Sequence, residues 1–399
     1  MAGEPRIYFD NAATTPVDPR VRAAMQPYLD GCFGNPSSLH VEGRTARAAV
    51  ENARRQVAEL VGASPSGVIF TGSGTEADNL ALVGAARAFA GQPVHIVTSA
   101  IEHPAVRETC AWLAQREGVT VTYTPVTPDG IVDPDAVAAL IGPETRLVSI
   151  MAANNVVGTL QPVRELARVA RARGVLFHTD AVQAASCVPL DMQRDGIDLL
   201  SLSGHKLYGP KGIGALVCAE NVPLAPVIHG GGQERGLRSG TENVAAIVGF
   251  GEAARLCATM RGDEAARLVQ LRERLIEGIR ARVPNAYVIG DLYRRLPGHV
   301  CLGFAGQEGE SIKLMLALDE AGVAVSTGSA CSAHKASEPS YVLTALGFDA
   351  FRARGALRIT LGRFNTEEEV DRFLDLLPRV VGELRPITSR MGAPVGARS

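Results

Sequence analysis

The chain has 399 residues, of which 46% are hydrophobic and 21% charged, and its formal net charge at pH 7 is -2. This length exceeds what one compact core normally holds, so we expect two domains. The near-neutral charge excludes a broad attraction for nucleic acid or anionic lipid, and no apolar stretch reaches the length of a membrane span or resembles a signal sequence. We therefore expect a cytoplasmic protein with no nucleic-acid or membrane partner.

Seven cysteines are scattered along the chain, and no two of them form a Cys-x-x-Cys pair. An odd, dispersed set favours neither a disulfide framework nor a four-thiolate zinc site. In a reducing compartment such cysteines are mostly small buried side chains, so a reactive one must be distinguished by its surroundings.

Short β-rich runs alternate with helical patterns in the first half of the chain. Helices are predicted over residues 76–90, 105–117 and 163–173, and strands over 68–71, 94–98, 119–124, 147–151, 175–179, 199–202 and 214–218. This alternation predicts a largely parallel sheet covered on both faces. Such sheets bind ligands at the carboxyl ends of their strands.

The pattern changes after Gly251. A long amphipathic helix is predicted over about residues 263–281 and looks like the connection to a smaller α+β domain. That domain is predicted to contain helices over 309–320 and 366–384 and strands over 287–289, 300–304, 323–326 and 357–361.

The resulting domain prediction has three parts. Residues 15–255 form a large ligand-binding domain, and residues 1–14 and 256–385 form the small domain. Residues 386–399, rich in Gly, Pro, Ser and Arg, form a flexible tail.

Residues 71–78 (TGSGTEAD) follow a predicted strand and open a predicted helix. Small residues there let backbone N–H groups approach a ligand at the positive end of the helix dipole, which is an anion site. A plain glycine turn, with Thr75 and Asp78 as a capping box, explains the segment equally well. The segment is neither a P-loop nor a dinucleotide fingerprint, because no Gly-Lys-Thr/Ser follows and the glycine spacing differs.

Lys206 stands at the end of an apolar strand, in the run Ser203-Gly204-His205-Lys206. A lysine among glycines leaves room for a ligand and can form an imine if desolvation lowers its pKa. The alternative is a solvent-exposed loop lysine, which does not explain the serine, glycine and histidine beside it.

Asp180 ends the apolar run 175–177 and is expected at the ligand edge of the sheet. A carboxylate there can hold a proton on a pyridine nitrogen and so make the ring an electron sink. The alternatives are a helix cap or, together with His178, a metal site. No third clustered ligand accompanies this pair, so we expect no metal.

Several further motifs occur in one order along the chain: residues 10–16 (DNAATTP), 33–38 (FGNPSS), 102–103 (EH), 154–155 (NN), 180–183 (DAVQ), 203–206 (SGHK), 238–241 (RSGT), 328–331 (GSAC) and 361–364 (LGRF). From Tyr8 to about Leu384 the chain resembles the cysteine desulfurases of iron-sulfur cluster assembly. These belong to the class V aminotransferase family of fold-type-I pyridoxal-phosphate enzymes. The resemblance implies an α/β, aspartate aminotransferase-like fold, with a mainly parallel sheet in the large domain and a smaller α+β C-terminal domain.

The resemblance also implies roles in binding pyridoxal 5'-phosphate. Lys206 is expected to bind the coenzyme as a Schiff base, Asp180 to pair with the pyridine nitrogen, and Gln183 to hydrogen-bond the ring hydroxyl. His103 is expected to stack on the ring and to move protons. Further contacts to the coenzyme are expected from Gly74, Thr75, Asn155, Ser203 and His205, and from Thr241 of a second subunit.

Cys331 is implied as the catalytic nucleophile. Its neighbours over residues 326–340 are mostly small and polar, which suits a flexible loop that brings a thiol into a site and then carries the bound group out of it. Asn155 and Arg358 are expected to bind the substrate carboxylate, for which a guanidinium is well suited. The alternative for Arg358, on the strand-like run 357–361, is a solvent-facing edge position.

The implied function is that of a cysteine desulfurase. This enzyme converts L-cysteine to L-alanine, forms a persulfide on Cys331, works as a homodimer, and passes the sulfur to a protein acceptor such as an iron-sulfur scaffold. Enzyme alternatives are a small aminotransferase, which does not need Cys331, and a selenocysteine lyase, which has a shorter cysteine loop. A catalytically silent sulfur carrier is a third alternative, and the presence of both Lys206 and Cys331 argues against it.

Overall fold

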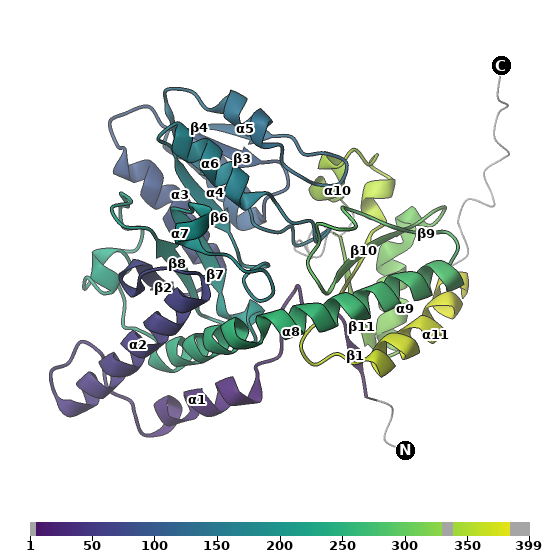
Figure 1. Ribbon diagram of the computed structural model, residues 1–399, viewed down its shortest axis with the longest axis horizontal. Helices are drawn as coiled ribbons and strands as arrows, with labels where there is room; N and C mark the ends of the chain where they lie inside the picture. Colours follow the sequence, from purple (N-terminus) through teal and green to yellow (C-terminus); the bar gives the residue numbers. More distant parts are fainter. Residues whose placement is uncertain (1–4, 329–337, 384–399) are drawn as a thin grey trace.

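The computed structural model describes residues 5–328 and 338–383. Its largest sheet has seven strands in the order β2-β8-β7-β6-β5-β3-β4 (Figure 1). All seven strands were predicted, each to within two residues: β2 (Val68–Thr71), β3 (His95–Ser99), β4 (Thr120–Thr124), β5 (Thr145–Ser149), β6 (Leu176–Asp180), β7 (Leu199–Ser203) and β8 (Gly214–Cys218).

The pairing of these strands confirms a largely parallel sheet. Strands β4, β3, β5, β6 and β7 pair in parallel, whereas β8 runs antiparallel to both β7 and β2. Parallel strands place their carboxyl ends at one edge of the sheet. At that edge β6 ends at Asp180 and β7 ends at Ser203.

Helices cover both faces of the sheet. The helices of this region are α1 (Pro19–Asp30), α2 (Val41–Leu60), α3 (Gly74–Ala88), α4 (Pro104–Arg116), α5 (Pro134–Leu140), α6 (Val163–Ala172) and α7 (Met192–Asp195). Neighbouring residues of a strand point to opposite faces, so Val68 lies in a core with α2 and α6, whereas Ile69 lies in a core with α3 and α4.

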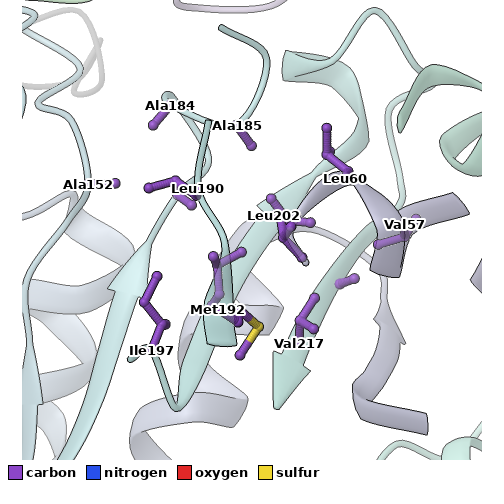
Figure 2. Packing of buried hydrophobic residues seen from close by; sticks show 14 of the residues in the cluster. Val57, Leu60, Ala152, Ala184, Ala185, Leu190, Met192, Ile197, Leu202 and Val217 are labelled. Atoms are coloured by element: carbon purple, nitrogen blue, oxygen red, sulfur yellow. The ribbon is translucent and has the colours of Figure 1, made fainter. Parts of the chain in front are cut away.

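The first of these cores contains apolar side chains from both the sheet and α2. Figure 2 shows Leu202 and Val217, from neighbouring strands, together with Val57 and Leu60 of α2. Because both faces of inner strands such as β7 and β8 are buried, these strands read in the sequence as largely apolar runs and not as strictly alternating ones.

Two smaller sheets are formed mainly by the C-terminal part of the chain, joined by β1 from its amino-terminal end. One has the order β12-β13-β10-β9 and is antiparallel, and the other pairs β1 with β11. The elements are β1 (Ile7–Tyr8), β9 (Ala286–Val288), β10 (His299–Phe304), α9 (Ser311–Glu320), β11 (Val323–Ala324), β12 (Ser326–Thr327), α10 (Tyr341–Ala345), β13 (Leu357–Thr360) and α11 (Glu367–Glu383). The single strand predicted over residues 323–326 is wrong, because the chain changes sheets at Val325.

Helix α8 (Val244–Arg282) is continuous over 39 residues and connects the two parts (Figure 1). The prediction that it starts near residue 263 is wrong. The helix begins where Asn243 Oδ1 accepts the Ala246 N–H at 3.2 Å. Gly251, which weakens a helix in isolation, lies where a Cβ would be 2.6 Å from Cα of Ala53 in α2, so close helix packing requires it.

The same helix contributes to two separate hydrophobic cores. Phe250 packs in the core of the large sheet, whereas Leu275 packs in the core of the smaller sheets. On this basis we propose that the large domain, residues 15–255, meets the small domain inside α8. The predicted tail over residues 386–399 lies outside the described residues. Within residues 5–328 and 338–383, no helix combines the length and the hydropathy of a membrane span.

Burial keeps His299 of β10 neutral. Its side chain is almost inaccessible, and Nε2 lies 2.9 Å from the Val156 carbonyl oxygen. Burial, with the charges of Arg358 and Arg295, lowers the pKa of His299 to about 3. The ordinary value of about 6.5 applies to the unfolded chain, which therefore binds a proton that the folded chain does not. Stability is consequently lost as the pH falls from about 6.5 towards 3.

We expect His299→Gln to reduce this acid sensitivity. Between about pH 6 and 4, the slope of the unfolding free energy against pH should fall by up to about 1.4 kcal/mol per pH unit. Denaturant unfolding at a series of pH values measures the slope. His229→Gln, at an exposed position, is the control and should leave it unchanged. An unaltered slope in His299→Gln would contradict the prediction.

Candidate active site

A cavity of about 450 Å³ lies at the carboxyl ends of β6 and β7. Side chains from both parts of the chain line it, since Arg358 and Ser326 belong to β13 and β12. Its lining includes every predicted site residue except Cys331 and Thr241, namely Gly74, Thr75, His103, Asn155, Asp180, Gln183, Ser203, His205, Lys206 and Arg358. The ligand edge predicted for the sheet therefore does contain a cavity.

The amino terminus of α3 forms one wall of this cavity. Ser73 Oγ accepts the Glu76 N–H at 3.1 Å, and Glu76 Oε2 accepts the Gly72 N–H at 2.8 Å. Ser73 is thus the N-cap of a helix that begins at Gly74. The capping box predicted for Thr75 and Asp78 is wrong, because both residues lie inside the helix.

Gly74 leaves space where the helix meets the sheet. A Cβ on this residue would lie 2.8 Å from Val182 Cγ2 and 3.1 Å from Ser203 Cβ. The backbone of the first helical turn can therefore lie close to the floor of the cavity. Combined with the positive end of the dipole of a 15-residue helix, this is the arrangement of an anion site.

Lys206 lies in the short 3₁₀ turn η2 (Gly204–Lys206) after β7 and is half-buried. Its Nζ donates to Ala13 O at 2.9 Å and also to Ala12 O. We call residues 10–15 the N-terminal strap, because Thr15 Oγ1 also donates to His205 O at 2.9 Å and fixes the segment over the turn. The alternative of a solvent-exposed loop lysine is wrong.

Asp180 is a buried carboxylate on the cavity wall. Its Oδ1 accepts the Val182 N–H at 2.9 Å. Burial raises the pKa of Asp180, and the nearby charges of His103 and Lys206 offset part of the rise. A cationic partner inside the cavity would stabilise the ionised carboxylate, since a buried charge is tolerated when it is paired.

Two more carboxyl groups are buried beside Asp180. Burial, together with the charge of Asp180, raises the pKa of Asp78 well above its ordinary value. Burial also raises the pKa of Glu102 to about 8, although Ser99 Oγ and the Met151 N–H donate to it. Of these three carboxyl groups, Asp180 is the one whose pKa the nearby charges of His103 and Lys206 lower, which favours its ionised form over those of the other two.

The ring of His103 caps α4 at the cavity. Its Nδ1 accepts the Ala105 N–H at 3.1 Å, and Pro104 occupies the first helical position. With Nδ1 as an acceptor, the neutral ring carries its proton on Nε2. While its cap remains in place the ring thus offers an Nε2–H donor at the cavity, and it can pass a proton on only when Nδ1 releases the Ala105 N–H and takes up a proton.

His205 is neutral at physiological pH. Burial, reinforced by the charges of Lys206 and Lys211, lowers its pKa to about 4. Its Nδ1 lies 3.1 Å from Thr14 Oγ1 in the N-terminal strap. This contact fixes the ring at the wall that also contains Ser203 and Gly74.

Arg358 has only 2% of its side chain exposed, so the alternative of a solvent-facing edge position is wrong. Its Nη1 donates to Asn155 O at 3.0 Å, and its Nη2 forms an ion pair with Asp10 Oδ1 at 2.9 Å. Asn155, predicted as its partner in binding a carboxylate, therefore lies beside it. The contact with Asp10 was not predicted.

Two predicted site residues are not in the cavity lining of the described residues. Thr241 is exposed, and Cys331 lies outside the described residues. Gln183 lines the cavity and donates from Nε2 to Ala12 O at 3.0 Å.

His178 is enclosed by serine hydroxyls. Its Nδ1 lies 2.8 Å from Ser149 Oγ and its Nε2 lies 3.0 Å from Ser201 Oγ. Within residues 5–328 and 338–383, no group of three or more His, Cys, Asp or Glu side chains is placed to hold a metal ion.

Comparison with known proteins places this fold and site in a family. The model of the class-V aminotransferases matches residues 7–373. Cysteine desulfurase IscS of Dictyoglomus turgidum is 45% identical over 382 residues, covering 96% of each chain. Cysteine desulfurase IscS of Methanosarcina thermophila is 47% identical over 388 residues, covering 96% of this chain and 95% of its own.

Solved structures agree with these relatives. A NifS-like protein superposes with a TM-score of 0.89 at 40% identity, covering 95% of this chain and 100% of its own. A structure described as SspA in complex with cysteine has a TM-score of 0.80 at 36% identity, covering 90% and 100%. The chain therefore belongs to the cysteine desulfurases of the class-V aminotransferase family, which are fold-type-I enzymes dependent on pyridoxal phosphate.

The cavity fits this coenzyme. The close approach at Gly74 leaves room for a phosphate at the α3 terminus, and Lys206 supplies an amine. Asp180, buried and raised in pKa, is a suitable partner for a protonated ring nitrogen. Anion site, amine and carboxylate all line one cavity, as a phosphorylated pyridine aldehyde requires.

Proposed function

We propose that this protein takes sulfur from L-cysteine onto its own Cys331 and releases L-alanine. The observation that carries the proposal is that Lys206, Asp180 and Arg358 line a single cavity. An amine, a carboxylate and a guanidinium there supply what an amino-acid substrate and its coenzyme need. The proposal gives each of the three a separate task.

We propose that Gly74, Thr75, Ser203 and His205 hold the coenzyme phosphate, while Asp180 pairs with the ring nitrogen and Gln183 with the ring hydroxyl. When bound, pyridoxal phosphate supplies an electron sink that weakens bonds at the substrate α-carbon. Burial supports the assignment of Asp180, because an ion pair in a dry site is stronger than one in water.

Three other side chains act on the substrate. Arg358, with Asn155 beside it, binds the α-carboxylate and orients the amino acid. Lys206 removes the α-proton once its amine is free, since it stands between the strap and the cavity. His103 moves a proton once Nδ1 releases the Ala105 N–H, because protonation at Nδ1 lets the ring give up its Nε2 proton and remain neutral.

The sulfur step uses Cys331. Its thiolate attacks the sulfur of the bound cysteine, a sulfur–sulfur bond forms, and the carbon–sulfur bond breaks. The carbon fragment takes up protons and leaves as L-alanine, so that L-cysteine and a thiol become L-alanine and a persulfide. A protein acceptor, such as an iron-sulfur scaffold, then receives the sulfur. A reducing compartment suits this thiol chemistry, so we propose a cytoplasmic location.

The product identifies the reaction. Incubated with L-cysteine, the holoenzyme is expected to form L-alanine without an added keto acid. An aminotransferase would instead convert an added amino donor to a keto acid, such as pyruvate from L-alanine. Quantifying alanine and pyruvate separates the two activities. Formation of keto acid without sulfur release would overturn the proposal.

We also propose that the enzyme is a homodimer in which Thr241 completes the partner's phosphate site. Thr241 is exposed and absent from the cavity lining of its own chain. Between α1 and α2, Phe33 is 81% exposed and Leu39 is 89% exposed. Large apolar side chains that point into solvent favour a protein contact, and a second copy of the chain is the proposed occupant.

A complementation experiment tests this sharing. Thr241→Asp places a negative charge beside the proposed phosphate and is expected to inactivate the homodimer, as is Lys206→Ala. A heterodimer of the two variants, isolated with two different tags, should regain one intact site. In that site the wild-type Lys206 of one subunit lies beside the wild-type Thr241 of the other. An inactive heterodimer would show that Thr241 serves its own chain, and an active Thr241→Asp homodimer would show that it serves neither site.

A further inference from the structure

Asp10 was part of a sequence motif without an assigned role. Its position is fixed by the strand that carries Arg358. The Ala12 N–H donates to Thr360 Oγ1 at 2.9 Å, the Asn11 side-chain amide donates to Thr360 O at 2.8 Å, and Asp10 forms a parallel bridge with Thr360. The N-terminal strap therefore cannot shift relative to β13 without breaking these bonds.

This attachment brings a carboxylate to the guanidinium of Arg358. The two side chains are 348 residues apart in the sequence and meet at 2.9 Å, with 18% of Asp10 and 2% of Arg358 exposed. Asp10 also lines the cavity. Its charge is consequently close both to the guanidinium and to any ligand bound there.

The guanidinium retains capacity for a further ligand. Nη1 and Nη2 donate to Asn155 O and to Asp10 Oδ1, whereas Arg358 Nε is buried without a hydrogen-bond partner among the described residues. Nε has almost no accessible surface, whereas Nη1 and Nη2 each carry a second N–H besides the one that bonds Asn155 O or Asp10 Oδ1, and these suit a ligand carboxylate. The ion pair thus holds Arg358 without occupying all of its donors.

The charges of the cavity wall restrict which ligand fits. The cationic side chains in the lining are Lys206 and Arg358, and the acids are Asp10, Asp78 and Asp180. Asp10 offsets the positive charge of Arg358, so the net charge of the pair is near zero before a ligand binds. The pair can then accept one carboxylate. A second carboxylate on the ligand would meet Asp10 in a partly dehydrated site, where Lys206 is the one other lysine or arginine among the described residues of the lining.

We propose that Asp10 determines substrate specificity by admitting amino acids with a neutral side chain and repelling those with a second negative charge. The inference rests on the proposed role of Arg358 as the receptor for the α-carboxylate. Arg358 alone recognises the α-carboxylate that all amino acids share. Asp10 adds discrimination between substrate side chains by their charge.

The test compares two ligands of nearly equal size that differ in charge. Binding of L-aspartate and L-asparagine to the holoenzyme is measured by calorimetry in the wild type, Asp10→Asn and Asp10→Ser. In the wild type, L-aspartate should bind at least about tenfold more weakly than L-asparagine. Both substitutions should bring the two dissociation constants to within about threefold.

A ratio of dissociation constants isolates the effect of charge. Both ligands carry the same α-carboxylate, so a general loosening of Arg358 weakens both and leaves the ratio unchanged. Asp371→Asn, which removes a carboxylate from an exposed ion pair with Arg274, is the matched control and should keep the wild-type ratio. An unchanged ratio in both Asp10 variants would overturn the proposal. If the wild type failed to form L-alanine from L-cysteine, the proposed function would fail instead, and the ratio would still report on Asp10.

Discussion

Replacing Lys206 with alanine is expected to lower the rate of alanine formation from L-cysteine by about 10³-fold or more. The variant loses the amine that anchors the coenzyme covalently and that removes the α-proton. It also loses the hydrogen bonds to Ala12 O and Ala13 O, which is a minor effect on folding of about 1 kcal/mol. Initial rates and the visible absorbance of the bound coenzyme measure the two losses.

Lys211→Ala is the matched control for this variant. Lys211 is an exposed lysine five positions further along the same loop and does not line the cavity. Its removal should leave both the rate and the absorbance close to wild type. If Lys206→Ala kept more than about a tenth of the wild-type rate, the base and anchor roles given to Lys206 would be wrong.

Replacing Cys331 with serine is expected to separate coenzyme binding from sulfur transfer. The variant should retain the visible absorbance, because Lys206 and Asp180 are intact, but it should form no persulfide and release no sulfide under reductant. A serine hydroxyl is not ionised at neutral pH and is a poor substitute for a thiolate. Absorbance spectra and sulfide release measure the two properties. Normal sulfide release by Cys331→Ser would refute the nucleophile assignment.

Most of the other cysteines are poor nucleophiles for a physical reason. Burial raises the pKa of Cys110, Cys187, Cys218 and Cys301 to about 12 and that of Cys257 to about 11. Few of these thiols are ionised at neutral pH. Cys32 is the remaining cysteine among the described residues. Cys32→Ser is the control and should retain sulfide release.

The large sheet was predictable because its strands are buried on both faces. Runs such as Leu199–Ser203 are mostly apolar, are buried over their whole length and are bounded by Asp198 and Gly204, so both their type and their bounds are encoded locally. The residues that follow β6 and β7, including Lys206, could be placed at the ligand edge for the same reason.

Features that depend on tertiary packing were not predictable. Gly249 and Gly251 lower the intrinsic helix propensity of residues 244–262, yet Gly249 packs against Met25 of α1 and Gly251 against Ala53 of α2, so close packing requires glycine and the helix continues. The start of α3 was misplaced because Ser73 and Thr75 are both good caps, and only the structure shows which one accepts the N–H. The pairing of Asp10 with Arg358 joins residues that no local pattern connects.

The destination of the substrate sulfur tests the account most directly. The holoenzyme is incubated with sulfur-labelled L-cysteine, alkylated, digested and analysed by mass spectrometry of its peptides. We predict one added sulfur atom on the peptide that contains Cys331, formed together with L-alanine. Alanine formation with the label on another cysteine, or on none, would contradict the account.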